Sequence, residues 1–384
     1  MKKILIIFTD LHLPYSPTTL KLFDELKKHY TVELLAAKPR TNYKRFNIDD
    51  PAIVFVDFDK IPSLLTRIWL FARRTFKKLF NSNFNKETKQ TLSTIKTNAI
   101  INYLRGKKNY EIIAKDGLAL WCAQKAGRKA HLLSLEIRDN YFDHVNFETI
   151  LSVIIQSEER LNHLFPDKKP PVYLIQNAPN YVHFDPSATN RNPEDLIYCG
   201  NALTSFGFIS CLDFIKDYKE YTLTAIGPMP QYTKTVIEQF YGDLVSEKRL
   251  IIKSDYLSED DLFHFLTGYR IGFAFYDFYR FETVNNFNYL SAPSGKVFQY
   301  LNSGLPIIAN RVPLLNFIEE NNCGVLLDYI SSIQIKKAID KIENNYATYA
   351  KNAKRYSKEN DFNTQIKPFI QFLNSDDYTD DTLS

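Results

Sequence analysis

The chain has 384 residues, of which 45% are hydrophobic and 24% are charged, and its net charge at neutral pH is +4. This length suits two domains with separate cores, and this composition excludes a largely disordered chain. The small net charge gives no reason to expect nucleic-acid binding, and the four cysteines are too scattered for a zinc motif or a disulfide framework. We therefore expect a folded protein of the reducing cytoplasm, with no nucleic acid among its partners.

In the first half of the chain, short apolar runs alternate with helix-length amphipathic segments. The opening run stops at Thr9 and Asp10 without the small residues of a signal-peptide cleavage site, so we interpret it as a buried strand. No stretch of about 20 uncharged apolar residues occurs that would span a membrane as a helix. Such alternation is typical of parallel sheets built from βαβ units. The strands expected in this half cover residues 3–8, 31–36, 53–56, 112–114, 131–135, 153–156 and 172–175.

The alternation is interrupted by a linker and then resumes. Residues 180–194 are rich in Asn, Pro, Ser and Thr, as linkers are. We predict an α/β protein with two Rossmann-like domains that face each other across a cleft, with ligands at the carboxyl ends of the strands. The predicted parts are domains at 1–185 and 190–358, a helix at 359–374 that packs back on the first domain, and a loose acidic tail at 375–384. The strands expected in the second domain cover residues 196–199, 221–226, 250–253, 271–275, 306–309 and 324–327.

The strongest functional signal is residues 291–309, with the sequence SAPSGKVFQYLNSGLPIIA. Pro293 suits the first turn of a helix, where Ser294 and Gly295 would leave backbone N–H groups accessible. Lys296 would add a full positive charge to the dipole of this helix. A helix that begins in this way can bind a diphosphate, although a plain helix start with a surface lysine is the alternative.

The same segment resembles the pattern S-P-x-K-x-F-E-Y-x-x-x-G-x-P-V-I-A of bacterial GT-B glycosyltransferases, in the retaining group that includes capsule and O-antigen sugar transferases. Further matches follow in the order of that group: SVIIQSEER at 152–160, LIQNAP at 174–179, YCGN at 198–201 and LTAIGP at 223–228. Two features depart from it. Ser291 and Gln299 stand where members often carry a pair of glutamates, and the loop at 201–207 lacks a basic residue that commonly meets the donor phosphates.

The resemblance implies the GT-B fold and a metal-independent, retaining, hexosyltransferase-type reaction. The donor would be a nucleoside diphosphate sugar, which is a substrate, and no cofactor is expected. The acceptor would be a hydroxyl of a glycan, lipid-linked or protein-linked molecule, in the synthesis of cell-surface polysaccharide or glycoconjugates.

The resemblance also assigns residues to the two halves of the reaction. Lys296 would act in catalysis by stabilising the departing diphosphate. Glu136, which follows a predicted strand, would act as general base or bind the acceptor; His12 is a further catalytic candidate, although a lone histidine is more often structural. Asp139 and His144 are lesser candidates. Donor contacts are expected from Gly200, Asn201, Gly227, Tyr256, Leu257, Ser294, Gly295, Lys296 and Gln299.

Residues 61–80 combine basic and aromatic side chains in one helix-length stretch. A basic amphipathic helix with tryptophan and phenylalanine suits an anionic membrane surface, and a core helix with a solvated basic face is the alternative. We therefore expect a cytoplasmic protein that is peripheral on the inner face of the cell membrane. The membrane contacts would come from Arg67, Trp69, Arg73, Arg74, Lys77 and Lys78.

Two other functions fit the same sequence features. A non-hydrolysing nucleotide-sugar epimerase has the same fold but usually needs a denser set of acidic, histidine and arginine residues. A catalytically silent GT-B subunit that activates a partner would explain the missing pair of glutamates.

Overall fold

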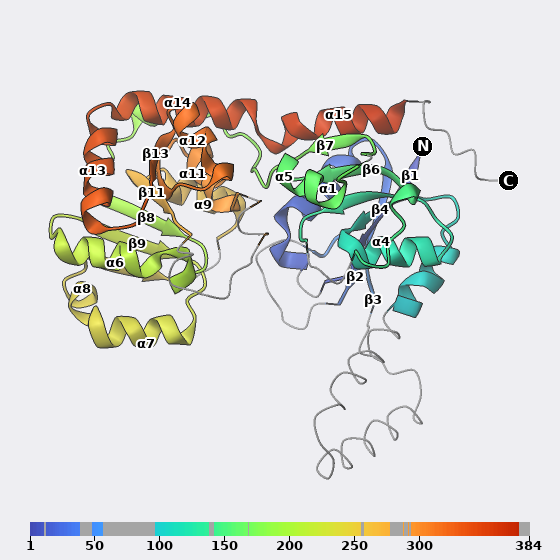
Figure 1. Cartoon of the computed structure of the whole chain (residues 1–384), viewed down its shortest axis with the longest axis horizontal. Helices are drawn as coiled ribbons and strands as arrows, with labels where there is room; N and C mark the ends of the chain where they lie inside the picture. Colours follow the sequence, from blue (N-terminus) through green and yellow to red (C-terminus); the bar gives the residue numbers. More distant parts are fainter. Residues whose placement is uncertain are drawn as a thin grey trace, which may run out of the picture. The chain divides into compact units, whose positions relative to one another are not determined.

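The computed structural model describes residues 1–10, 13–38, 48–56, 97–137, 142–167, 169–254, 257–276, 287, 291 and 293–375. These residues belong to two compact units (Figure 1). Unit 1 comprises Met1–Ile155 and Phe165–Tyr173, and unit 2 comprises Gln156–Leu164 and Leu174–Ser384. The short helix α5 (Glu158–Leu164) therefore belongs to unit 2, although the strands on either side of it in sequence belong to unit 1.

Unit 1 is built on a seven-stranded sheet with the order β3-β2-β1-β4-β5-β6-β7. Strand β1 pairs in parallel with both β2 and β4, so the strand order reverses beside β1. Ligands of open α/β sheets bind at the carboxyl ends of the strands at such a point. The elements of this unit are β1 (Lys3–Phe8), α1 (Pro17–Lys27), β2 (Thr31–Ala37), β3 (Ile53–Val56), a helix at 97–105, β4 (Glu111–Lys115), α4 (Asp116–Lys125), β5 (Ala130–Ser134), β6 (Ile150–Ile155) and β7 (Val172–Leu174).

Unit 2 contains a six-stranded sheet with the order β10-β9-β8-β11-β12-β13, in which every neighbouring pair is parallel. Its strands are β8 (Asp195–Cys199), β9 (Thr222–Ile226), β10 (Leu250–Lys253), β11 (Ile271–Ala274), β12 (Ile307–Asn310) and β13 (Gly324–Leu327). Besides α5, its helices are α6 (Phe208–Asp217), α7 (Gln231–Phe240), α8 (Gly242–Ser246), α9 (Glu259–Leu266), α11 (Gly295–Asn302), α12 (Phe317–Glu320), α13 (Ser332–Glu343), α14 (Tyr346–Glu359) and α15 (Phe362–Asn374).

Helices cover both faces of the sheet in unit 2. Phe208 and Phe214 of α6 pack with Ile339 of α13 in the core on one face. Phe298 of α11 packs with Tyr356 of α14 in the core on the other face. In the view of Figure 1, α6 and α7 lie below the strands, and α12 and α14 lie above them. A parallel sheet buried on both faces explains why its strands read as continuous apolar runs.

Several helices of unit 2 begin where the local sequence supplies an N-cap. The side chains of Ser258, Ser331 and Asp361 accept hydrogen bonds from backbone N–H groups in the first turns of α9, α13 and α15. Serine and aspartate at this position satisfy donors that have no partner inside the helix.

All the strands expected from the sequence are present, and most of their ends differ from the expected ends by one residue or none. The largest difference is at β6, which begins at Ile150 rather than at Val153. The α/β class and the two Rossmann-like units are thus confirmed.

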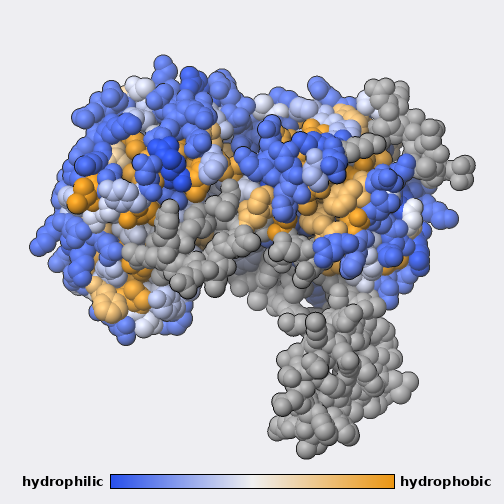
Figure 2. Space-filling model, viewed as in Figure 1, coloured by the Kyte–Doolittle hydropathy of each residue, from blue (hydrophilic) through white to orange (hydrophobic). Residues whose placement is uncertain are grey.

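The space-filling view shows hydrophilic residues over much of the described surface of unit 2, with a small hydrophobic area near α7 and α8 (Figure 2). Phe240 and Val245 are exposed in these helices. In the part of the chain that the structure describes, no helix is long and apolar enough to cross a membrane.

Candidate functional site

The first turn of α11 offers hydrogen-bond donors to a ligand. Ser294 is the N-cap in an extended conformation, and Val297 N–H donates to its carbonyl oxygen at 3.0 Å. Among the described residues, the backbone N–H groups of Gly295 and Lys296 have no acceptor. The Ser294 N–H, which was expected to be accessible, instead donates to the Tyr276 hydroxyl at 3.0 Å because this ring reaches the helix start. The donors presented by α11 therefore begin one residue later than expected.

Gly295 packs closely against Asn177 at this helix start. A Cβ atom added to it would lie 2.9 Å from Nδ2 of Asn177, closer than real Cβ contacts. Asn177 belongs to the LIQNAP segment that resembles the GT-B pattern. The two motifs, more than a hundred residues apart in sequence, therefore meet at the start of α11.

Lys296 is a buried cation that faces aromatic rings. Lys296 is the second residue of α11, and only 9% of the residue is exposed to solvent. Its Nζ atom lies 4.6 Å from the ring centroid of Tyr198 and 5.5 Å from that of Phe206. Burial lowers the pKa of Lys296 to about 8, and the nearby thiols of Cys199 and Cys211 oppose this shift. The alternative of a plain surface lysine is therefore wrong.

No carboxylate within the described residues forms an ion pair with Lys296. A buried charge without a counter-ion is unfavourable, and cation–π contacts offset only part of the cost. An anionic ligand at the first turn of α11 would supply the missing counter-charge, and the helix dipole there favours the same ligand.

Two glycines bring the carboxyl ends of β8 and β9 into backbone contact. Gly200 and Gly227 have φ angles of 108° and 129°, which L side chains rarely adopt. A Cβ atom at Gly227 would lie 2.5 Å from the carbonyl oxygen of Gly200. Asn201 follows as an exposed residue, and its carbonyl oxygen accepts a hydrogen bond from Tyr198 at 2.9 Å. A Cβ atom at Gly200 would meet no atom within 4 Å, so the backbone is open on that side of the loop.

Tyr300 fixes α11 to this end of the sheet, a role that the sequence did not reveal. Its hydroxyl accepts the Cys199 N–H at 2.7 Å and lies 3.2 Å from the carbonyl oxygen of Phe273. A side chain at Gly272 would collide with the Tyr300 ring at 2.6 Å. The signal was present, because an aromatic residue in the middle of a helix and a glycine inside a strand both point to close packing.

The two positions that often hold glutamates are occupied by neutral side chains that bind other elements. Ser291 Oγ accepts a hydrogen bond from Arg160 Nε at 3.1 Å, and the carbonyl oxygen of Ser291 accepts one from Ser157 at 2.7 Å. Gln299 Nε2 donates to Glu259 at 3.0 Å, while its Oε1 atom is buried without a partner in the described structure. Residues 157–160, the SEER part of the SVIIQSEER motif, are thus hydrogen-bonded to Ser291, which precedes α11.

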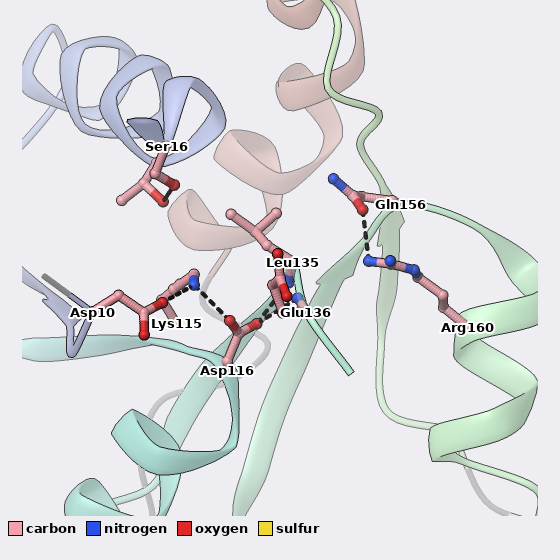
Figure 3. Close-up of polar contacts among 9 residues, drawn as sticks. Asp10, Ser16, Lys115, Asp116, Leu135, Glu136, Gln156 and Arg160 are labelled. Atoms are coloured by element: carbon pink, nitrogen blue, oxygen red, sulfur yellow. Dashed lines mark hydrogen bonds and ion pairs between the residues drawn. The ribbon is translucent and has the colours of Figure 1, made fainter. Parts of the chain in front are cut away.

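Unit 1 has a charged cluster at the carboxyl ends of β1, β4 and β5 (Figure 3). Lys115, which is 5% exposed at its side chain, lies 2.5 Å from Asp10 and 2.7 Å from Asp116. Asp116 also accepts the backbone N–H groups of Leu135 and Glu136 at 2.7 and 2.9 Å. Glu136 itself is half-buried. The cluster therefore holds the loop that carries Glu136 next to the carboxyl ends of β1 and β4, between which the strand order reverses.

Burial and charge shift the pKa values of this cluster. Lys115 is buried, but the charges of Asp116 and Asp10 outweigh the burial and raise its pKa. Burial raises the pKa of Asp116 despite the neighbouring Lys115 charge. Asp116 has a positive φ of 60°, uncommon for a residue other than glycine. Sequence spacing could not reveal a cluster that joins three separate strands.

Of the remaining predicted site residues, the structure describes Leu257 and His144. Leu257 is partly buried and packs against the core beside α11 and α9. His144 is exposed in a turn. Across the described residues, no group of three or more His, Cys, Asp or Glu side chains is placed to hold a metal ion. The predictions for His12, Asp139, Tyr256, Arg67, Trp69, Arg73, Arg74, Lys77 and Lys78 lie outside the described residues.

No family model matches this sequence, and no curated protein matches it. Solved structures match nearly the whole chain. Sucrose-phosphate synthase from Thermosynechococcus elongatus is 14% identical with a TM-score of 0.67, over 96% of this chain and 98% of that one. HepE from Anabaena, in complex with UDP and glucose, is 13% identical with a TM-score of 0.63, over 96% and 99%.

A third structure is a putative UDP-N-acetylglucosamine 2-epimerase from Listeria monocytogenes, 11% identical with a TM-score of 0.61 over 98% of each chain. At these identities, the likeness establishes the fold alone. The chain therefore has the α/β GT-B fold of two Rossmann-like domains that its sequence predicted.

Proposed function

We propose that this protein is a glycosyltransferase that moves a sugar from a nucleoside diphosphate sugar to an acceptor hydroxyl. The observation that carries the proposal is the start of α11, where the buried Lys296 has no carboxylate partner among the described residues and two backbone N–H groups lack acceptors. A diphosphate supplies the negative charge that this arrangement lacks. The UDP in the similar HepE structure makes UDP the first nucleotide to test.

The chemistry follows from these donors. As the bond from the sugar to the diphosphate breaks, negative charge grows on the leaving oxygen. Lys296 and the N–H groups of Gly295 and Lys296 stabilise this charge through positions fixed before the reaction. The proposed reaction needs neither a metal ion nor an organic cofactor, and it retains the anomeric configuration. Gly200, Asn201, Gly227, Leu257, Ser294 and Gln299 complete the proposed donor site, with Tyr256.

The acceptor half of the proposal rests on unit 1. Glu136 is held at the carboxyl end of β5 by the bond from its N–H to Asp116, which places it where α/β sheets bind ligands. It binds the acceptor hydroxyl or accepts its proton. The proposed acceptor is a glycan, lipid-linked or protein-linked molecule of a cell-surface pathway. The basic and aromatic residues at 61–80 support a peripheral location on the inner face of the cell membrane.

The test begins with ligand binding and proceeds to turnover. Thermal shifts should be measured with UDP, GDP, ADP and their glucose and N-acetylglucosamine conjugates, since a ligand of the folded state raises its stability. The best donor should then be incubated with and without mixed membrane glycolipids, and its products separated. We expect a stabilising nucleotide and donor consumption that rises with acceptor.

The possible outcomes separate the candidate functions. Conversion of the donor to an isomeric nucleotide sugar without acceptor would indicate an epimerase. Binding of nucleoside diphosphate with no turnover under any condition would indicate a silent subunit. Absence of any shift with every nucleotide would contradict the proposal itself.

A further inference from the structure

Two buried cations lie at the opposite end of α11 from its open N–H groups. Arg191 is 3% exposed and Lys354 is 6% exposed. Arg191 donates to the carbonyl oxygens of Ser303 and Gly304 at 2.7 and 2.8 Å. Lys354 Nζ donates to the carbonyl oxygen of Asn302 at 2.6 Å. The two cations therefore bind consecutive carbonyl groups at the C-terminal end of the helix.

The other contacts of these cations are also neutral. Arg191 donates to the carbonyl oxygen of Thr267 at 2.9 Å and to the Tyr346 hydroxyl at 2.9 Å. Lys354 donates to the carbonyl oxygen of Val182 at 2.6 Å and lies 4.4 Å from the ring centroid of Tyr181. Within the described part of the chain, neither side chain forms an ion pair with a carboxylate.

Two like charges buried together are unfavourable. Burial, followed by the charge of Arg191, lowers the pKa of Lys354 to about 8. Elsewhere in unit 2 a partly buried cation has a partner, as Arg270 does with Glu343 at 2.6 Å. The negative end of the α11 dipole favours cations, but only by a partial charge. Together with Lys296, three buried cations lie on or against one helix of eight residues, with no balancing anion among the described residues.

The length of the helix allows the two ends to interact. Eight residues span about 12 Å along the helix axis. At an effective dielectric constant of about 20, a unit charge at that distance changes the affinity for another unit charge by about fivefold to tenfold. A diphosphate carries more than one negative charge, so it responds more strongly than a monophosphate.

We propose that Arg191 and Lys354 are positioning residues of the diphosphate site, which fix α11 by its C-terminal carbonyls and raise the positive potential at its N-terminus. This inference rests on the proposed function, since it assumes that an anion binds there. Through this positive potential, Lys354 strengthens phosphate binding without contacting the phosphate. The linker at 180–194, which contains Arg191, and the helix α14, which contains Lys354, are thereby joined to the proposed donor site.

The experiment compares affinity and stability in the full-length protein. Dissociation constants for UMP, UDP and inorganic pyrophosphate should be measured by calorimetry for wild type, Lys354→Met and Arg191→Gln. We expect each variant to lose about fivefold to tenfold in UDP affinity and less in UMP affinity. Arg249→Met is the matched control, because it removes a partly buried cation that is already balanced by Glu247. It should change stability in urea but leave UDP affinity within about twofold of wild type.

Several outcomes of these measurements would contradict the proposed role of Arg191 and Lys354. Wild-type UDP affinity in Lys354→Met would overturn it, and so would equal losses for UMP and UDP, which indicate a distorted site rather than a missing charge. Loss of folded protein in both variants would overturn it as well, because the cations would then serve stability alone. If wild type binds neither UDP nor pyrophosphate, the proposed function fails first, and this inference fails with it.

Discussion

Each unit contains a buried lysine, and the two lysines differ in whether a carboxylate balances their charge. In unit 1, Lys115 lies between Asp10 and Asp116, and their charges raise its pKa. In unit 2, Lys296 lies beside the aromatic rings of Tyr198 and Phe206, and burial lowers its pKa to about 8. A lysine whose charge is balanced within the fold stabilises the fold. A lysine whose charge is not balanced destabilises the free protein, and in the proposed donor site a bound diphosphate would supply the counter-charge.

The largest expected effect follows from breaking the balanced site. Lys115→Met removes the cation and leaves Asp116 buried, with its carboxylate bound among the described residues by two backbone N–H groups alone. Removal of one partner of a buried ion pair costs about 3 to 5 kcal/mol of unfolding free energy. Urea unfolding at neutral pH should show this loss, whereas UDP affinity of the folded variant should remain unchanged.

The pH dependence of this loss has a definite sign. The Asp116 pKa is already raised in the folded protein, so the folded state binds a proton more readily than the unfolded state does. Stability of the variant should therefore recover as the pH falls toward the range in which Asp116 is protonated. An undiminished deficit at low pH would show that the deficit comes from lost packing instead of an unbalanced carboxylate.

The next largest effect concerns the unbalanced site. Lys296→Met removes a charge that contacts the leaving group, and the loss of one such interaction typically lowers turnover by roughly a hundredfold. The same variant should be more stable than wild type without ligand by about 1 to 2 kcal/mol at neutral pH, since it no longer buries an uncompensated charge. Lys337→Met, which changes an exposed lysine of α13, is the matched control for both measurements.

Turnover tests whether Lys296 belongs to the donor site, and the stability of the ligand-free variant tests whether its buried charge is uncompensated. Normal turnover in folded Lys296→Met would remove Lys296 from the donor site. Lower stability of the ligand-free variant would show that the cation–π contacts with Tyr198 and Phe206 outweigh the cost of burial.

Much of the fold was predictable because each element is encoded locally. The strands are buried on both faces and read as apolar runs, and the start of α11 is marked by a proline, a serine and a glycine in sequence. Lys296 was predicted as a donor-site residue from the same local pattern. Its burial was not, because that depends on Tyr198 and Phe206, which come from a different part of unit 2.

The missed residues all act across long sequence distances. Lys115 and Asp10 are 105 residues apart, and Lys354 and Asn302 are 52 apart. Tyr300 lies inside the recognised motif, but its partner Cys199 lies 101 residues away. Spacing within one segment reports on one helix or strand, whereas these contacts depend on strand order and helix packing.

The pH dependence of nucleotide binding is a smaller effect, which reports directly on whether the charge of Lys296 is balanced in the free protein. In the proposed donor site the protonated form of Lys296 binds the diphosphate, and burial lowers the pKa of Lys296 in the free protein to about 8. UDP affinity should therefore be constant below this pH and fall by up to about tenfold per pH unit above it, with proton uptake on binding.

The stability of ligand-free wild type should change with pH in the opposite direction. The unfolded state keeps the Lys296 proton up to the ordinary pKa of 10.5, so the free energy of unfolding should rise as the pH increases between about 8 and 10.5. Calorimetry in buffers of different ionisation enthalpy would measure the proton uptake, and Lys296→Met should abolish it. Affinity that stays level across this range in wild type would mean that Lys296 is already charged without its ligand, and that its environment is as balanced as that of Lys115.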